Sequence, residues 1–236
     1  MSILLFVPLL FAADKPQLIV AAASDLAPIE NQLASNLSTV CGCVVRFATG
    51  SSGLLARQIR NGAPFDLFLS ANDAYVKELS TDGHLLAATV RVYARGRLAL
   101  WSPKGSIRRL EDLAGSGISR IAIANPVHAP YGVAARQALE RAGLWRRLES
   151  RMVLGENVRQ ALQFAESGNV DAALVSWSLV LNRGGVLVPE SVHSAILQSG
   201  AVTTVSRHRA LGSCILEFLT GPGGRRVLEQ AGFGAP

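Results

Sequence analysis

The stretch Leu-Ile-Val-Ala-Ala-Ala-Ser-Asp-Leu-Ala-Pro, residues 18–28, decides the fold of this chain. Its first residues form a short apolar run that ends at small polar ones, the pattern of a buried strand in a parallel sheet. Apolar residues then recur at three- and four-residue steps as far as Val40, which predicts an amphipathic helix with Ser24 or Asp25 as its N-cap. Such a turn leaves free N–H groups and the positive end of a helix dipole at the sheet edge. We therefore expect an anion site there.

The same strand-to-helix pattern recurs along the chain. Residues 43–48 and 65–71 read as further strands, and each leads through small polar residues into an amphipathic helix. The later half offers equivalent turns near Tyr131 and near Val158. Strands that alternate with helices predict an α/β protein with parallel sheets.

Two long extended segments divide these units into two groups. They are residues 90–101 and 195–206, and each is long enough to cross from one layer to another. We expect two lobes joined by these crossings, which would act as a hinge. The first lobe would comprise residues 17–92 plus 198–236, and the second residues 93–197.

Composition narrows the class of protein. Of the 236 residues, 49% are hydrophobic and 17% are charged, which is typical of a folded globular chain. The net charge is +6, but the basic residues are scattered, with only pairs such as Arg108 and Arg109. Because no basic stripe with interleaved aromatic residues is present, we expect no nucleic-acid partner.

The first residues resemble an export signal. Residues 3–11 form an apolar run that is too short to span a bilayer but fits the core of a signal peptide. We predict that residues 1–13 are removed after Ala13. The absence of a basic residue before the run, and Phe11 at the third position before the cut, leave a buried N-terminal strand as the alternative.

The three cysteines leave two interpretations open. Either Cys41 or Cys43 pairs with Cys214, or all three are buried thiols; of these, packing is the interpretation we favour. A zinc site is not expected, because the histidines lie far apart and none is spaced with a cysteine.

Several motifs occur together in order, and the set covers nearly the whole chain, residues 17–233. They are Ala-Ala-Ala-Ser-Asp-Leu at 21–26, Gly-Ser-Ser-Gly at 50–53, Leu-Ala-Arg-Gln-Ile at 55–59, Asn-Gly-Ala-Pro-Phe-Asp-Leu-Phe-Leu-Ser-Ala at 61–71 and Asn-Pro at 125–126. This ordered set resembles the periplasmic molybdate-binding protein family.

The resemblance implies a type II periplasmic binding protein fold, in which two lobes with mostly parallel sheets are joined by two crossing segments. A tetrahedral oxyanion, molybdate or tungstate, would bind between the lobes. Delivery would be to an inner-membrane ABC permease with its ATPase. The resemblance also implies a periplasmic monomer that is not an enzyme and has no cofactor, since molybdate is the transported ligand.

The resemblance also implies the residues that hold the ion. Hydroxyl donors would be Ser24 and either Ser52 or Ser51, and main-chain N–H donors would come from Tyr131 and Val158. Family members often carry a tyrosine or another donor after the strand that corresponds to 171–175. This chain has other residues there, so the fifth contact is assigned to Ser176, with Ser178 in reserve.

Three other functions are alternatives for this sequence. A Ser-dependent hydrolase could be assembled from Ser24, His128 and Asp66, but no Gly-x-Ser-x-Gly elbow is present. A ligand-sensing regulator of the same fold would need a DNA-binding segment, and we expect none before Gln17. Another anion, such as sulfate, thiosulfate or a phosphonate, is the alternative within the binding class. Each serine taken alone could equally serve only as a helix cap.

Overall fold

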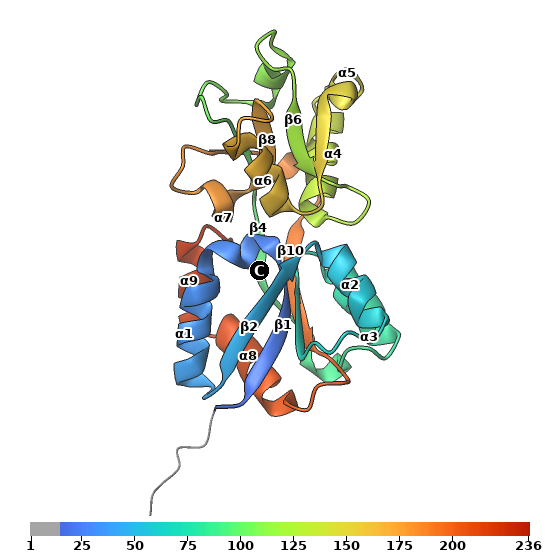
Figure 1. Cartoon of the computed structure of the whole chain (residues 1–236), viewed down its shortest axis with the longest axis vertical. Coiled ribbons are helices and arrows are strands. Elements are labelled where there is room, and N and C mark those ends of the chain that lie inside the picture. The colour runs from blue at the N-terminus through green and yellow to red at the C-terminus, as the bar shows by residue number, and fades with distance from the viewer. Residues whose placement is uncertain (1–14) are drawn as a thin grey trace, which may run out of the picture.

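The computed structural model describes residues 15–236, which form two α/β lobes stacked along the long axis of the molecule (Figure 1). The expected leader, residues 1–13, lies outside the described residues. Each lobe contains one five-stranded sheet covered by helices. The prediction of a two-lobed α/β protein is therefore confirmed.

The first lobe is built on a mixed sheet in which three neighbouring strands are parallel and two are antiparallel to their neighbours. In spatial order these strands are β2 (Val44–Gly50), β1 (Gln17–Ala23), β3 (Leu67–Ser70), β10 (Ile196–Val202) and β4 (Arg91–Gly96). Its helices are η1 (Ser24–Ile29), α1 (Glu30–Val40), α2 (Ser52–Arg60), α3 (Asp73–Thr81), η2 (Ala87–Thr89), α8 (Arg209–Thr220) and α9 (Pro222–Gln230). Apolar side chains of α1, α8 and α9 pack on one face of the sheet, and those of α2 and α3 pack on the other.

The second lobe repeats this architecture with a second mixed sheet. In spatial order its strands are β7 (Met152–Gly155), β6 (Ile121–Ala124), β8 (Ala172–Ser176), β5 (Leu98–Trp101) and β9 (Val186–Leu187). Its helices are η3 (Leu110–Ala114), α4 (Pro130–Arg141), α5 (Trp145–Leu148), η4 (Glu149–Arg151), α6 (Val158–Glu166), α7 (Trp177–Val180) and η5 (Glu190–Val192). Strands β7, β6 and β8 run parallel to one another, whereas β5 is antiparallel to β8 and β9.

The chain crosses between the lobes at two places. It leaves the first sheet after β4 and enters the second at β5, so that a single residue, Arg97, separates the two strands. It returns after η5 and rejoins the first sheet as β10. Both crossing strands are antiparallel to their neighbours, because they arrive directly from the other lobe and not through a crossover helix. The expected lobe boundaries, 92/93 and 197/198, fall inside β4 and β10.

A disulfide joins Cys41 to Cys214, and the two Cα atoms are 5.9 Å apart. The preferred interpretation of three buried thiols was therefore wrong for this pair, although Cys43 is a buried free thiol as that interpretation required. The two bonded residues are separated by 173 positions. They meet because α1 and α8 pack on the same face of the first sheet, a neighbourhood that spacing along the sequence does not reveal.

The first strand-to-helix turn differs from the prediction. Neither Ser24 nor Asp25 caps a helix: Ala23 occupies the N-cap position, and residues 24–29 form the 3-10 helix η1 before α1 begins at Glu30. Two other helices do have side-chain N-caps. The side chain of Asn72 accepts the N–H of Ala74, and that of Asn157 accepts the N–H groups of Arg159 and Gln160.

Candidate functional site

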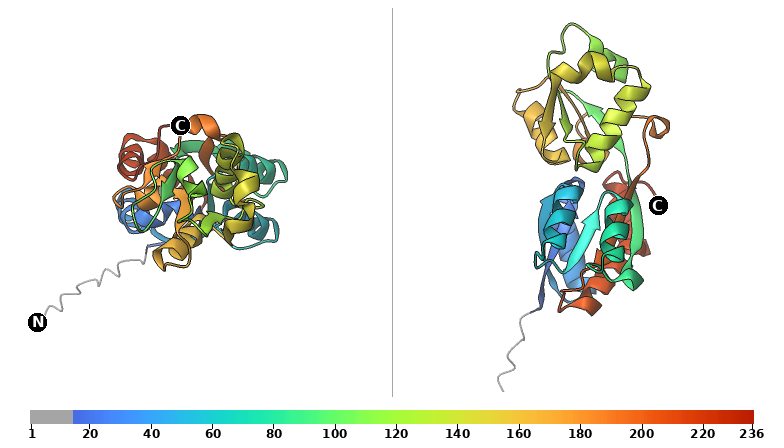
Figure 2. Two further views of the ribbon diagram at one scale, coloured as in Figure 1. Left: turned by 90° about the horizontal axis from the view of Figure 1, so that it is seen from above. Right: turned by 90° about the vertical axis from the view of Figure 1, so that its right-hand side faces the viewer.

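The carboxyl ends of the parallel strands in the two lobes face each other. In the first sheet Ala23 is paired with Gly50, so the turns after β1 and β2 emerge at the same level. In the second sheet Ala124 is paired with Gly155, which brings the turns after β6 and β7 together. The right-hand view of Figure 2 shows the lobes meeting end to end across this junction.

A small cavity of about 10 Å³ lies at this junction. Residues of both lobes line it: Ala23, Ser24, Asp25, Gly50, Ser51, Ser52, Ala71, Ala129, Pro130, Tyr131 and Val158. Five of the six predicted binding residues are thus brought together, and Ser176 is not among the lining residues. Space for about one small molecule is available, whereas pockets for drug-sized organic ligands measure roughly 300–1,000 Å³.

Larger hollows occur elsewhere among the described residues, and four of them measure between about 290 and 450 Å³. One of about 430 Å³ is lined by residues of the first lobe, including Phe65 and His208. Another of about 440 Å³ is lined by residues of the second lobe, including Arg108 and Arg141. Each of these two is confined to a single lobe. Two others take residues from both lobes: one of about 450 Å³ is lined by Gly50, Ser51 and Glu156 among others, and one of about 290 Å³ by Asn72, Pro130 and Ile196 among others. Neither is lined by Ser24, Asp25 or Tyr131, which all line the small cavity.

Helix N-termini point their N–H groups toward the small cavity. Helix α4 starts at Pro130, and proline is well suited to this first position because the N–H it lacks would be unpaired anyway. Gly132 allows the start of α4 to lie close to the end of β6, since a Cβ at this position would lie 2.1 Å from the carbonyl oxygen of Ala124. The main-chain N–H groups of Tyr131 and Val158 have no hydrogen-bond partner among residues 15–236. They are free to donate to a ligand.

The two adjacent serines make different contacts. Ser52 Oγ accepts the N–H of Ala71 at 3.0 Å, and its own proton has no acceptor among the described residues. Ser51 Oγ lies 2.7 Å from the carbonyl oxygen and 2.9 Å from Nδ1 of His128, in the opposite lobe. Because a hydroxyl has only one proton to donate, Ser51 is committed to the contact between lobes while Ser52 can donate into the cavity.

A buried hydrogen-bond network surrounds Asp25, which is fully buried. Its Oδ2 accepts a 2.9 Å bond from the hydroxyl of Tyr131 and a 2.5 Å bond from Nε2 of Gln198. The other carboxylate oxygen, Oδ1, has no partner among the described residues. Burial raises the pKa of Asp25 to about 6, although the bonds from Tyr131 and Gln198 and the nearby main-chain N–H groups of Asp25 and Leu26 act in the opposite direction.

Ser176 and Ser178 support this network from the second lobe. Ser176 Oγ donates to the Tyr131 hydroxyl at 3.0 Å and lies 2.8 Å from Ser178 Oγ. Ser178 Oγ in turn donates to the main-chain carbonyl of Asp25 at 2.7 Å. Both serines are buried beside the cavity, and their recorded contacts are with the network.

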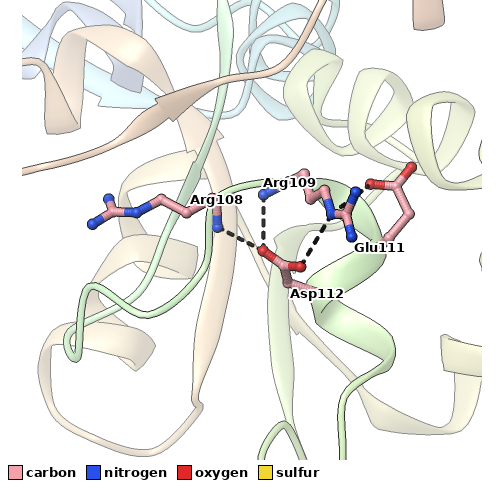
Figure 3. Close-up of polar contacts among 4 residues, drawn as sticks. All are labelled: Arg108, Arg109, Glu111 and Asp112. Carbon is pink, nitrogen blue, oxygen red and sulfur yellow. Dashed lines mark hydrogen bonds and ion pairs between the residues drawn. The ribbon is translucent and has the colours of Figure 1, made fainter.

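Among residues 15–236, no lysine or arginine lines the cavity. The basic pair noted in the sequence, Arg108 and Arg109, lies at the start of η3 in the second lobe (Figure 3). Main-chain N–H groups of this pair donate to Asp112, and the bond from Arg108 is the main cause that lowers the pKa of that carboxyl. The guanidinium of Arg109 pairs with Asp112 and Glu111. This cation is therefore neutralised at the surface.

Sequence reasoning missed several residues of the site. It assigned Asp25 only a capping role, Tyr131 only a main-chain donor and His128 only a place in an unsupported hydrolase set. It gave Gln198 and Tyr93 no role, yet the Tyr93 hydroxyl lies 3.3 Å from Gln198 Oε1. These contacts join residues roughly a hundred or more positions apart, and no local motif signals them.

Among the described residues, no group of three or more histidines, cysteines and acidic residues is arranged to hold a metal ion. In the same part of the chain, no helix has the length and apolar character needed to cross a membrane. The chemistry that the cavity offers is therefore hydrogen-bond donation from hydroxyl and main-chain groups, with one buried carboxyl beside them.

Comparison with known proteins places this architecture in a class. The profile of the family described as bacterial extracellular solute-binding proteins matches residues 18–234. The chain therefore belongs to this family, whose members bind solutes and are not enzymes.

Within this family, the relatives of the chain include molybdate-binding proteins. The molybdate-binding protein ModA of Azotobacter vinelandii is 32% identical over 94% of this chain and 92% of its own length. A solved structure of the periplasmic molybdate-binding protein of the same organism superposes with a TM-score of 0.88, at 30% identity, over 93% of this chain and 99% of that one. A putative ABC transporter substrate-binding lipoprotein of Bacillus subtilis is 31% identical over 79% of this chain and 74% of its own length. The family resemblance seen in the motifs is thus confirmed.

Proposed function

We propose that this chain binds molybdate or tungstate in the small cavity between its lobes and delivers the ion to a membrane ABC transporter. The observation that carries the proposal is a cavity with donors from both lobes and no cationic side chain. Similarity over almost the whole chain to named molybdate-binding proteins supports the choice of ion.

The ion would be held by hydroxyls of the first lobe and by main-chain groups of the second. We assign Ser24 and Ser52 as the hydroxyl donors; Ser24 Oγ makes no hydrogen bond to another described residue. The N–H groups of Tyr131 and Val158 would complete the set from the opposite side. We assign Ser51 and Ser176 to positioning roles, because their recorded hydrogen bonds hold His128 and Tyr131.

A dianion can be stable here without an arginine. Hydrogen bonds to a charged group are roughly twice as strong as neutral ones, and helices α2, α4 and α6 all begin at the cavity. Preorganised N–H groups at helix ends therefore supply the positive potential that a charged side chain would otherwise provide.

Delivery would take place outside the cytoplasmic membrane. We propose that the chain is exported, works as a periplasmic monomer and presents its closed form to an ABC permease with its ATPase. Membership of an extracellular solute-binding family and the Cys41–Cys214 disulfide support export, since disulfides persist in oxidising compartments.

Another tetrahedral oxyanion, such as sulfate, is the alternative within the same fold. Thermal unfolding with molybdate, tungstate, sulfate and phosphate separates the two possibilities. A ligand at about a hundred times its dissociation constant stabilises the folded state by roughly 2.7 kcal/mol. We expect molybdate and tungstate to raise the melting temperature at micromolar concentration, whereas sulfate and phosphate should do so only at far higher concentration. Equal shifts with sulfate would favour the alternative.

A further inference from the structure

The carboxyl group of Asp25 is the unusual component of an anion-binding cavity. It lines the cavity and its side chain is completely buried. Tyr131 and Gln198 both donate to Oδ2, whereas Oδ1 has no partner among the described residues. An anion that enters this cavity would therefore lie near the buried carboxyl group of Asp25.

No cation compensates Asp25. Tyr93 and Tyr131 are the titratable groups nearest to it, and burial raises both of their pKa values well above the usual range, so the phenols stay neutral. Glu30 on α1, Arg159 on α6 and Arg46 on β2 belong to elements packed against η1, and none forms an ion pair or hydrogen bond with Asp25. On β4, Arg95 pairs with Glu190. Helix α7 and strands β1 and β10 carry no charged residue. On α4, Arg136 pairs with Glu140 and Arg141 donates to the carbonyl oxygen of Ser191.

Two negative groups in a dry cavity of this size would repel each other strongly. Like charges in close contact disfavour ionisation, and the low dielectric of a buried site strengthens their repulsion. Protonation of Oδ1 removes the repulsion and turns an unpartnered acceptor into an O–H donor. From this geometry we infer that the chain takes up a proton on Asp25 as it binds its oxyanion, so that ion and proton enter the closed site together. This inference rests on the proposed function.

The proton would come from solvent before the lobes close, and it forms the Oδ1–H bond without breaking any bond in the protein or the ligand. Burial already raises the pKa of Asp25 to about 6 in the closed structure, and a neighbouring dianion would raise it further. At a pH between the pKa of Asp25 in the free protein and its pKa in the bound protein, binding therefore consumes about one proton. In that window the affinity falls as the pH rises, by up to about tenfold per pH unit.

Calorimetric titration of the wild-type protein with molybdate tests this directly. Titrations near neutral pH in two buffers of different ionisation enthalpy report the number of protons exchanged. We expect an uptake approaching one proton per ion, and an affinity that weakens with rising pH. Tight binding without proton exchange, at an affinity independent of pH, would overturn the inference while leaving the proposed function intact. If molybdate produced no binding at all, both would fail.

A matched pair of variants locates the proton. Asp25→Asn keeps an acceptor for Tyr131 and Gln198 and adds a permanent N–H donor, so it should bind molybdate without proton uptake and with little pH dependence. Asp82→Asn changes an exposed aspartate at the end of α3 and should behave as the wild type does. Undiminished proton uptake in Asp25→Asn would contradict the assignment. If that variant fails to fold, the wild-type titration still decides the question.

Discussion

The hydroxyl of Tyr131 donates a 2.9 Å hydrogen bond to Oδ2 of Asp25, and this bond joins the two lobes. Tyr131 thus acts at two points of the site. Its main-chain N–H faces the cavity from the start of α4, while its side chain reaches past the cavity into the opposite lobe. Since the bond can form only when the lobes are together, it couples occupation of the cavity to closure.

Tyr131→Phe should therefore weaken binding, although the main-chain donor is unchanged. An ordinary hydrogen bond contributes about 0.5–1.5 kcal/mol, so we expect an affinity loss of up to roughly tenfold in a calorimetric titration. Tyr75→Phe is the matched control, because the Tyr75 hydroxyl makes no hydrogen bond to another described residue. An unchanged affinity would show that the Tyr131 hydroxyl does not contribute to binding.

The hydroxyl assignment predicts unequal effects for the serines. Ser24→Ala and Ser52→Ala should each cost about 1.5–3 kcal/mol of binding free energy, since each removes a donor to a charged ligand. Ser51→Ala removes only the contact with His128 and should cost less. Ser119→Ala, at an exposed position of the second lobe, serves as the control. A larger loss for Ser51→Ala than for Ser52→Ala would reverse the assignment.

Gly53→Ala should hold the lobes apart. A Cβ at this position would lie 2.5 Å from the carbonyl oxygen of His128, in the other lobe, where the N–H of Gly53 now donates at 3.0 Å. Separation of the lobes would relieve that clash. The Tyr75 hydroxyl, 2.7 Å from the same Cβ, is the end of a flexible side chain of the first lobe and can turn aside, so the variant should fold normally but bind weakly. Solution scattering should show that molybdate reduces the radius of gyration of the wild type and not of this variant.

Gly117→Ala is the control for this experiment, since nothing lies within 4 Å of a Cβ built there. It should close with ligand as the wild type does. Compaction of Gly53→Ala to the wild-type dimensions would show that His128 can move aside, and that this contact does not limit closure.

Reduction of the Cys41–Cys214 disulfide should lower stability without abolishing binding. The bond joins residues 173 positions apart, neither of which lines the cavity, and loss of a native disulfide typically costs about 2–5 kcal/mol. We expect a lower melting temperature for the Cys41→Ser, Cys214→Ser double variant, with molybdate affinity close to that of the wild type. Cys43→Ser removes the free thiol and serves as the comparison.

Much of the fold was predictable because its signals are local. The apolar run at β1, the caps Asn72 and Asn157, and the alternation of strands with helices each depend on neighbouring residues. The disulfide and the antiparallel crossing strands were not predictable in this way, because they depend on which elements pack side by side.

Several residues that line the candidate site were predictable for the same reason. Ser24, Ser52, Tyr131 and Val158 all follow strand ends, and parallel strands place such turns at one edge. The role of Asp25 was hidden, because its partners Tyr131 and Gln198 come from distant elements. An argument from charge alone would also have excluded Asp25 from an anion site, because a carboxylate repels an anion.

The measurement that tests the account most directly is a calorimetric titration of the mature protein with molybdate and, separately, with sulfate. It is repeated with the Ser24→Ala, Ser52→Ala double variant. We predict one molybdate ion per chain, bound far more tightly than sulfate by the wild type, and a large loss of affinity in the double variant. Equal affinity for the two anions, or unchanged molybdate binding by the double variant, would contradict a molybdate site at this cavity.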